Sequence, residues 1–202
     1  MNKKDLYPKA IAVYNAVLSL LKEGSDVTKL TVSDIAKAAG IGKGTTYEYF
    51  SSKDEIIAKS LIYGYKLMMG YIVEKLKNAD KLWDKISVLY ETSVEFEFVR
   101  VMGNQVFNAV STSEEMQQKI IELFEEEKKS ENIYEVIAKQ LTDCAVREGF
   151  LSADADKDYV FYVSMAMFQL IFSPIGCMMH NRISMDAQKK HLYHMYINSL
   201  KQ

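Results

Sequence analysis

Apolar residues recur every three or four positions along most of the chain, which is the spacing that gathers them on one face of an α-helix. No alternating run of apolar and polar residues is long enough to require a strand, so we predict an all-α fold. Gly40 is suited to a left-handed helix stop, and Gly149 interrupts the pattern further on. The predicted helices are 4–22, 32–39, 42–49, 53–78, one containing Leu82 to Ser93, a weaker one at 101–111, 113 to about 147, 154 to about 179, and 184–200.

The first four predicted helices form a pattern of their own, because two of them are very short. Thr31 is a favoured cap for the helix 32–39, and Asp34 adds a carboxylate to its first turn. We therefore expect two domains: residues 1–52, built from three helices, and a larger helical domain over residues 53–202.

Composition excludes several classes of protein. With 49% hydrophobic and 26% charged residues in a chain of 202, disordered and fibrous proteins are excluded. Two cysteines cannot form a disulfide framework and no signal peptide is evident, which favours a reduced, cytoplasmic protein. The net charge of −2 excludes a polycation, yet residues 1–53 hold eight lysines against five acidic residues. The positive end of the chain is thus its N-terminal domain.

Residues 159–179 carry no formal charge over 21 positions, a length that permits a membrane span. Ser164, Gln169, Ser173 and Pro174 interrupt this stretch. We expect a helix that is buried on several sides, against its own core and a second subunit, and no membrane span.

Four residues near the C-terminus have ligand types and a rough spacing that suit zinc: Cys177, His180, His191 and His194. Pairs three residues apart share a helix face, so a four-ligand site is conceivable. The alternative is that both later histidines are exposed polar residues and Cys177 fills the core. No acidic residue or second cysteine reinforces the array, so we predict no metal site.

The segment from Leu30 to Ile57 carries the functional signal. A helix of two turns, a turn containing glycine and a second short helix make a helix-turn-helix, whose second helix enters the DNA major groove. Gly42 and Gly44 lack side chains, which lets backbone N–H groups approach a phosphate closely. The packing side is Ile35, Ala36, Ala39, Ile41 and Phe50, and the polar side is Lys43, Thr45, Thr46 and Tyr47.

The sequence motifs do not support an enzymatic function. The pair Gly42-Lys43 is similar to the end of a phosphate-binding loop, but Lys37 and Gly44 occupy positions where that motif needs glycine and Ser or Thr. The chain also has no nucleophile elbow, no paired carboxylates with a histidine and no glycine-rich cofactor loop. We predict a protein that is not an enzyme and carries no cofactor.

At these residues the chain resembles the TetR family of bacterial transcriptional regulators, over roughly residues 4 to 60. The matching pattern is Ile35-Ala36-x-x-Ala39-Gly40-Ile41, then Lys43-Gly44-Thr45-x-Tyr47-x-Tyr49-Phe50, then Lys53-x-x-Ile56. The resemblance implies an N-terminal three-helix DNA-binding domain and a larger helical domain that binds a small effector and dimerises. It also implies DNA contacts from Thr31, Ser33, Lys43, Gly44, Thr45, Thr46, Tyr47, Tyr49 and Lys53.

Some of these roles have alternatives within the small domain. Tyr47 and Tyr49 could pack internally, and Thr31 could serve only as a helix cap. Two residues depart from the family pattern. Gly42 stands where a serine cap is usual, and Glu48 stands where a basic, aromatic or polar residue is common. If Glu48 faces DNA, it repels phosphate or accepts a hydrogen bond from a cytosine amino group.

The resemblance leads to a functional hypothesis: a homodimeric repressor that leaves a palindromic DNA operator when a small hydrophobic effector binds. Of 23 aromatic residues, 18 follow residue 53, which favours an apolar effector pocket and a dimer interface there. The last two predicted helices would form a four-helix bundle with those of a second subunit. The alternative is a helical DNA-binding or adaptor protein without an effector. Candidate pocket residues, each of which could instead be plain core, are Trp83, Tyr90, Phe107, Tyr134 and Phe168.

Overall fold

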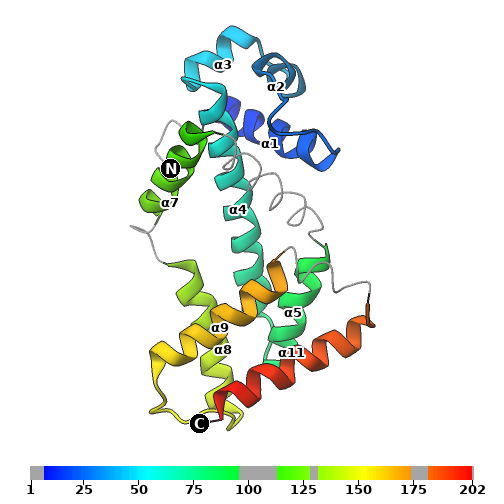
Figure 1. Ribbon diagram of the computed structural model, residues 1–202, viewed down its shortest axis with the longest axis vertical. Helices are drawn as coiled ribbons and strands as arrows, with labels where there is room; N and C mark the ends of the chain where they lie inside the picture. Colours follow the sequence, from blue (N-terminus) through cyan, green and yellow to red (C-terminus); the bar gives the residue numbers. More distant parts are fainter. Residues whose placement is uncertain (1–6, 96–112, 128–131, 174–181, 202) are drawn as a thin grey trace. The chain divides into compact units, whose positions relative to one another are not determined.

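The computed structural model describes residues 7–95, 113–127, 132–173 and 182–201, and every regular element in these ranges is an α-helix (Figure 1). The predicted all-α fold is confirmed. The predicted helix at 101–111 lies outside the described residues. The helices are α1 (Pro8–Lys22), α2 (Val32–Ala38), α3 (Lys43–Tyr49), α4 (Lys53–Lys77), α5 (Leu82–Glu95), α7 (Glu114–Glu127), α8 (Ile133–Arg147), α9 (Lys157–Phe172) and α11 (Met185–Leu200).

The chain divides into two compact units. Unit 1 contains α1, α2, α3, the part of α4 up to Met68, and α7. Unit 2 contains the part of α4 from Met69 onward, α5, α8, α9 and α11. Each unit is described by itself below.

Unit 1 has its core where the three short helices meet. Helix α1 contacts both α2 and α3, and α2 contacts α3. The Tyr14 side chain of α1 is fully buried, with its ring centroid 5.7 Å from that of Phe50 and 5.2 Å from that of Tyr63. These ring contacts join α1 to the end of α3 and to α4, and so determine which side of α3 remains outside.

Helix α2 ends in a left-handed glycine, as its sequence predicts. Gly40 has a φ of +68°, a region that residues with a Cβ seldom adopt. Its N–H donates to the carbonyl of Lys37 (3.2 Å), and the N–H of Ile41 donates to the carbonyl of Ala36 (3.0 Å). This pair of bonds is a Schellman motif, which satisfies the last carbonyls of α2 and sets the turn before α3.

The start of the first helix differs from its prediction at Lys4. Helix α1 begins at Pro8, and Tyr7 before it is extended, with φ −67° and ψ 144°. Proline suits the first helical position because its φ is already helical and no partner is needed for an N–H there. The hydrophobic spacing alone carried no information on this boundary.

The predicted single helix from Ser113 to Arg147 is wrong, because the structure has two helices, α7 and α8, in different units. Ser113 does cap the first, accepting a hydrogen bond from the N–H of Met116 (3.1 Å). A second cap starts α8, where the side chain of Asn132 accepts from the N–H of Tyr134 (3.1 Å). Residues 125–132, between the apolar residues of α7 and those of α8, are all polar, so this segment of the sequence offers no apolar side chain to bury.

Helix α9 is shorter than the predicted helix 154–179. The Asp156 carboxylate accepts from the N–H groups of Asp158 (2.9 Å) and Tyr159 (3.2 Å), which starts the helix at Lys157. The helix ends at Phe172, and Ser173 is extended, as expected before a proline. At 16 residues it is too short for a membrane span, which needs about 20.

Helix α4 is the one helix of the described residues that is long and apolar enough to cross a membrane, judged by length and composition alone. Half of its most apolar window is buried inside the protein. Core helices of soluble proteins pass the same test, so this observation is weak support for a span.

In unit 2, α5 contacts α8, α9 and α11, and α9 packs on both α8 and α11. Two buried hydroxyl groups, those of Ser164 and Tyr196, lie 2.9 Å apart and join α9 to α11. Burial raises the pKa of Tyr196 to about 12. A buried lysine, Lys85 of α5, donates from Nζ to the carbonyl of Leu76 (2.5 Å) near the end of α4, and burial lowers its pKa.

Candidate DNA-binding surface

One side of α3 is exposed, and we call it the α3 outer face: Lys43, Gly44, Tyr47 and Glu48. Successive helix residues are rotated by about 100°, so these four positions fall within an arc of about 140°. Tyr47 is 49% exposed. Three of the four are predicted DNA-contacting residues, and the structure brings them together on a surface open to a partner.

No contact in the described structure requires a glycine at position 44. A Cβ built at this position meets no heavy atom within 4 Å, apart from its own neighbours in the chain and helix. Its backbone is helical, where glycine is less favourable than alanine. The missing side chain therefore leaves space on the α3 outer face that the fold itself does not use.

The prediction that Thr46 contacts DNA does not agree with its position. Thr46 has no exposed surface, and its Oγ1 donates to the carbonyl of Gly42 (3.3 Å). Thr46 precedes Phe50 by four residues, so both lie on one side of α3, and Phe50 packs against Tyr14 of α1. That spacing was a signal in the sequence, because Phe50 already belonged to the predicted packing side.

Thr45 and Tyr49 are half-buried and lie outside the arc of the α3 outer face, about 60° and 100° beyond Glu48 around the helix. The ring of Tyr49 lies 6.2 Å from Tyr7 and 6.5 Å from Phe50, centroid to centroid. Tyr49 thus packs within unit 1 and keeps only part of its surface for a partner, whereas Tyr47 has no ring contact with another described residue.

Thr31 is a helix cap in this structure, which was one of the two readings of its sequence position. Its Oγ1 donates to the Asp34 carboxylate (2.6 Å) and accepts from the N–H of Asp34 (3.2 Å), while its own N–H donates to the same carboxylate (3.1 Å). The Thr31 hydroxyl and N–H together lower the pKa of Asp34. Ser33, the next candidate, is exposed on the first turn of α2.

Lys53 reaches back to the loop before α2. Its Nζ donates to the carbonyl of Thr28 at 3.1 Å, and its side chain is half-buried. In this position Lys53 holds the start of α4 against the α1–α2 loop. A phosphate contact from Lys53 would have to share the ammonium group with that carbonyl.

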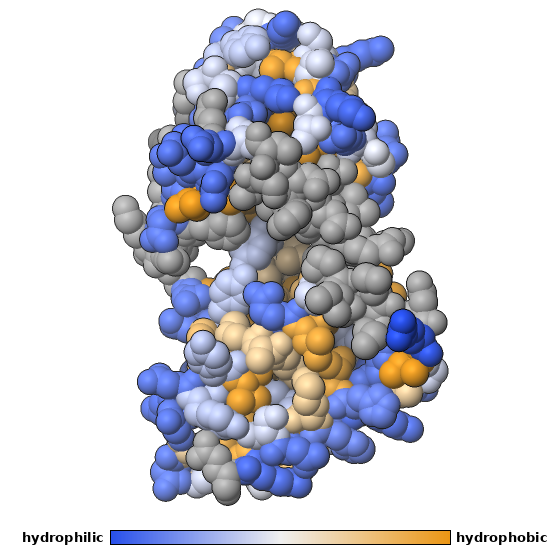
Figure 2. Space-filling model, in the orientation of Figure 1, coloured by the Kyte–Doolittle hydropathy of each residue, from blue (hydrophilic) through white to orange (hydrophobic). Residues whose placement is uncertain are grey.

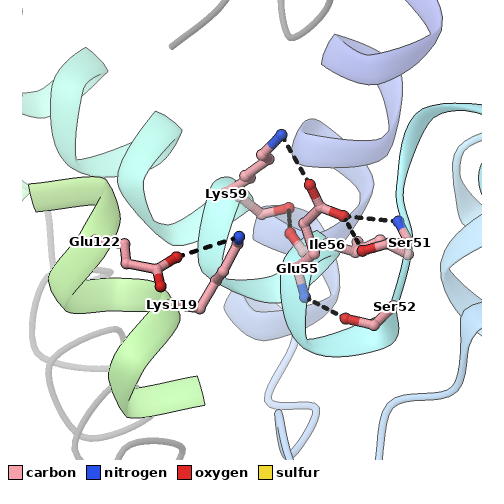
Figure 3. A network of polar contacts seen from close by, with 8 residues as sticks. Ser51, Ser52, Glu55, Ile56, Lys59, Lys119 and Glu122 are labelled. Carbon is pink, nitrogen blue, oxygen red and sulfur yellow. Dashed lines mark hydrogen bonds and ion pairs between the residues drawn. The ribbon is translucent and has the colours of Figure 1, made fainter. Parts of the chain in front are cut away.

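Sequence reasoning missed a polar network at the start of α4 (Figure 3). The Glu55 carboxylate accepts from the N–H (2.7 Å) and hydroxyl (2.6 Å) of Ser51 and pairs with Lys59 (3.0 Å). Partial burial alone would raise the pKa of Glu55, but these contacts outweigh it and hold the pKa at about 2. Ser51 follows Phe50, the C-cap residue of α3, so the network links the end of α3 to α4.

Glu55→Gln is expected to lower the free energy of unfolding by about 1 kcal/mol at pH 7, because a charged cap becomes neutral. The folded-state pKa lies below the ordinary value of 4.5. The contribution of Glu55 is therefore full above about pH 4.5 and disappears as the pH falls toward 2. Urea unfolding at pH 7 and pH 3 measures this difference.

Glu122→Gln is the matched control, since Glu122 is an exposed glutamate of α7 that, among the described residues, pairs with Lys119 alone (3.4 Å), on its own helix. We expect nearly no change there. An equal loss of stability for Glu55→Gln at both pH values would contradict the assigned role of the carboxylate.

In unit 2 the predicted pocket residues fall into separate groups. The ring of Tyr134 lies 5.7 Å from Phe168, which stacks on Phe172 at 4.5 Å, again between centroids. Trp83 packs instead against Tyr193 at 5.4 Å. Tyr90 is fully buried, and Phe107 lies outside the described residues. The ring contact that joins two members of the set is that between Tyr134 and Phe168.

The structure describes two members of the Cys/His array. His191 and His194 are exposed on α11, and Cys177 and His180 lie outside the described residues. In the part of the chain that is described, no group of three His, Cys, Asp or Glu residues could hold a metal ion.

Comparison with known proteins identifies the segment that carries this surface. Residues 26–60 match the family model of the bacterial regulatory proteins, tetR family. The HTH-type transcriptional regulator SAR0097 of Staphylococcus aureus is 30% identical over 98 residues, which cover 44% of this chain and 51% of that protein. The chain spans about half the length of the curated relatives it matches.

Solved structures extend the likeness in fold to nearly the whole chain. The fatty acid degradation regulator FadR of Bacillus halodurans superposes with a TM-score of 0.62 at 18% identity, covering 97% of this chain and 98% of that one. The transcriptional regulator FadR of Bacillus subtilis, in complex with stearoyl-CoA, gives 0.59 at 17% identity, covering 94% and 98%. At these identities the likeness shows the fold alone.

Proposed function

We propose that this chain is a member of the tetR family of bacterial regulatory proteins, whose family model its residues 26–60 match, and that it is a dimeric repressor released from DNA by a small hydrophobic effector. Residues 1–52 would bind the operator, and residues 53–202 would bind the effector and dimerise. A cytoplasmic location follows from the DNA target.

The observation that carries the proposal is the α3 outer face. It presents a lysine, an exposed tyrosine and a glycine with open space beside it, which together allow a phosphate contact, a base contact and a close approach of backbone to DNA. The matched family segment spans α2, α3 and the start of α4, the elements that position this face. From the earlier set of candidates we keep Ser33, Lys43, Gly44, Thr45, Tyr47 and Tyr49 as DNA contacts.

Dimerisation is supported by an exposed stripe on α9. Tyr159, Tyr162, Ala166, Gln169 and Leu170 are all exposed and fall within an arc of about 100°. Tyr162 is 78% exposed, and Met195 of the adjoining α11 is 41% exposed. Figure 2, in the orientation of Figure 1, has apolar residues gathered over the part of unit 2 where α9 runs. Such a stripe is typical of a helix that packs on a partner.

An effector of apolar character is supported by the contact between Tyr134 and Phe168, with Phe172 stacked beside it. A protein of the same fold binds stearoyl-CoA. Release from DNA requires that the effector bind the DNA-incompetent state more tightly than the competent one, since equal affinity shifts no equilibrium. A ligand at this cluster would act by tilting α4 and changing the separation of the two α3 helices.

The proposal is tested by electrophoretic mobility shift with duplex DNA from upstream of the protein's own gene. We expect a specific complex for the wild type and at least a tenfold loss of affinity for Lys43→Ala. Lys139→Ala, which removes an exposed lysine of α8, is the control and leaves the affinity unchanged. The absence of specific retardation at low salt would refute the proposal.

The same assay also tests whether a hydrophobic effector releases the protein from DNA. Long-chain acyl-CoA is the first probe to add to the preformed complex, and dissociation of the DNA supports a hydrophobic effector. A complex that survives all apolar probes, together with an unchanged melting temperature, would favour a DNA-binding protein without an effector.

A further inference from the structure

Glu48 is the acidic member of the α3 outer face. It lies at one edge of the exposed arc, with Lys43 at the other edge and Tyr47 between them. A carboxylate on a surface that meets DNA is repelled by the phosphates, so its presence there calls for a compensating contact.

The carboxylate of Glu48 is also unpaired, unlike its neighbours. Every other acidic side chain of residues 7–60 accepts a hydrogen bond: Glu23 from Ser19, Asp26 from Thr28, Asp34 from Thr31, Asp54 from Ser113 and Glu55 from Ser51. Glu48 forms no hydrogen bond or ion pair with any described residue. Within the described part of unit 1, its carboxylate therefore stabilises no cap, turn or helix contact.

A free carboxylate on the major-groove side of a helix has one suitable partner among the bases. Cytosine presents its N4 amino group as a donor in the major groove, and an ionised carboxylate can only accept. Guanine and thymine offer acceptors at the same edge, which the carboxylate repels. The adenine amino group is flanked by the N7 acceptor, which suits an amide rather than a carboxylate.

We propose that Glu48 determines operator specificity by accepting a hydrogen bond from a cytosine amino group in each half-site. This inference rests on the proposed DNA-binding function and adds the base that α3 selects. Glu48 reads sequence in this arrangement, whereas Lys43 contributes affinity that is nearly independent of sequence.

The test is selection of bound duplexes from a randomised DNA library, using the full-length wild type, Glu48→Gln and Glu23→Gln. The wild type should enrich cytosine at one position of each half-site, by roughly 10- to 100-fold over the other bases. Glu48→Gln should enrich adenine at that position, since glutamine pairs with the N6 and N7 groups of adenine, and leave the remaining positions unchanged. Glu23→Gln removes an equal charge just after the end of α1 and should select the wild-type sequence.

The possible failures are distinguishable. The same preferred base at every position for wild type and Glu48→Gln would overturn the role of Glu48 while leaving the DNA-binding function in place. Recovery of no sequence by the wild type would overturn the proposed function and this inference together. Glutamine is as good a helix former as glutamate, so folding of the variant is not at issue.

Discussion

Gly44→Ala is expected to make this protein more stable and, at the same time, a weaker DNA binder. The new methyl group meets no atom of the described chain within 4 Å, and alanine loses less backbone freedom on folding than glycine. We expect the free energy of unfolding to rise by roughly 0.5 kcal/mol. The same methyl group stands on the α3 outer face, where it would hold DNA away from the backbone.

The loss of affinity should be roughly tenfold or more, about the effect of one mismatched base pair in the operator. Urea unfolding measures the gain in stability, and a mobility-shift titration measures the loss of binding. A gain in stability together with a loss of DNA affinity would distinguish a glycine that serves DNA binding from one that only shapes the helix.

Gly70→Ala provides the matched control. Gly70 is an exposed glycine inside α4, and a Cβ built there also meets nothing within 4 Å. It should stabilise the fold to a similar degree and leave the DNA affinity unchanged. A Gly44→Ala variant that binds DNA as tightly as the wild type would contradict the placement of DNA against α3.

Tyr162→Asp is expected to dissociate the proposed dimer and to lower DNA affinity by two orders of magnitude or more. Tyr162 is 78% exposed in the single chain, so its replacement leaves unit 2 folded. At the centre of an apolar interface, however, an aspartate would bury an unpaired charge, which costs several kcal/mol. A lone subunit contacts one half-site and loses the gain in effective concentration that the second subunit brings.

Sedimentation velocity at micromolar concentration measures the mass, and mobility shift measures the affinity. Ala153→Asp adds the same charge on the exposed loop between α8 and α9, and it should remain dimeric with wild-type affinity. A Tyr162→Asp variant that sediments as a dimer would show that α9 does not form the interface.

Short-range features were predictable because their interactions lie within a few residues of one another. The Thr31–Asp34 capping box and the Gly40 stop both depend on contacts over three to five residues. The two readings of Thr31 could not be separated from the sequence, because a cap and a phosphate contact use the same hydroxyl group. Only the position of the Asp34 carboxylate showed that the hydroxyl is already engaged.

Longer-range contacts could not be predicted from the sequence, for a different reason. Lys53 meets a carbonyl 25 residues earlier in the chain, and Lys85 meets Gln140 across 55 residues. No local pattern encodes such partners. The division between α7 and α8 also depends on the two helices packing in separate units, since the polar residues between them are compatible with a continuous helix.

The amino-acid sequence by itself determined that this protein is helical and that a helix-turn-helix lies near its N-terminus, because helix periodicity, caps and glycine stops are local properties. The tertiary structure decided which side chains of α3 remain available. Thr46 is buried and Phe50 packs against Tyr14 of α1, so one side of α3 faces inward while Lys43, Gly44, Tyr47 and Glu48 stay outside. Burial is a property of the assembled core, so a list of polar residues becomes a surface only when the helices have packed.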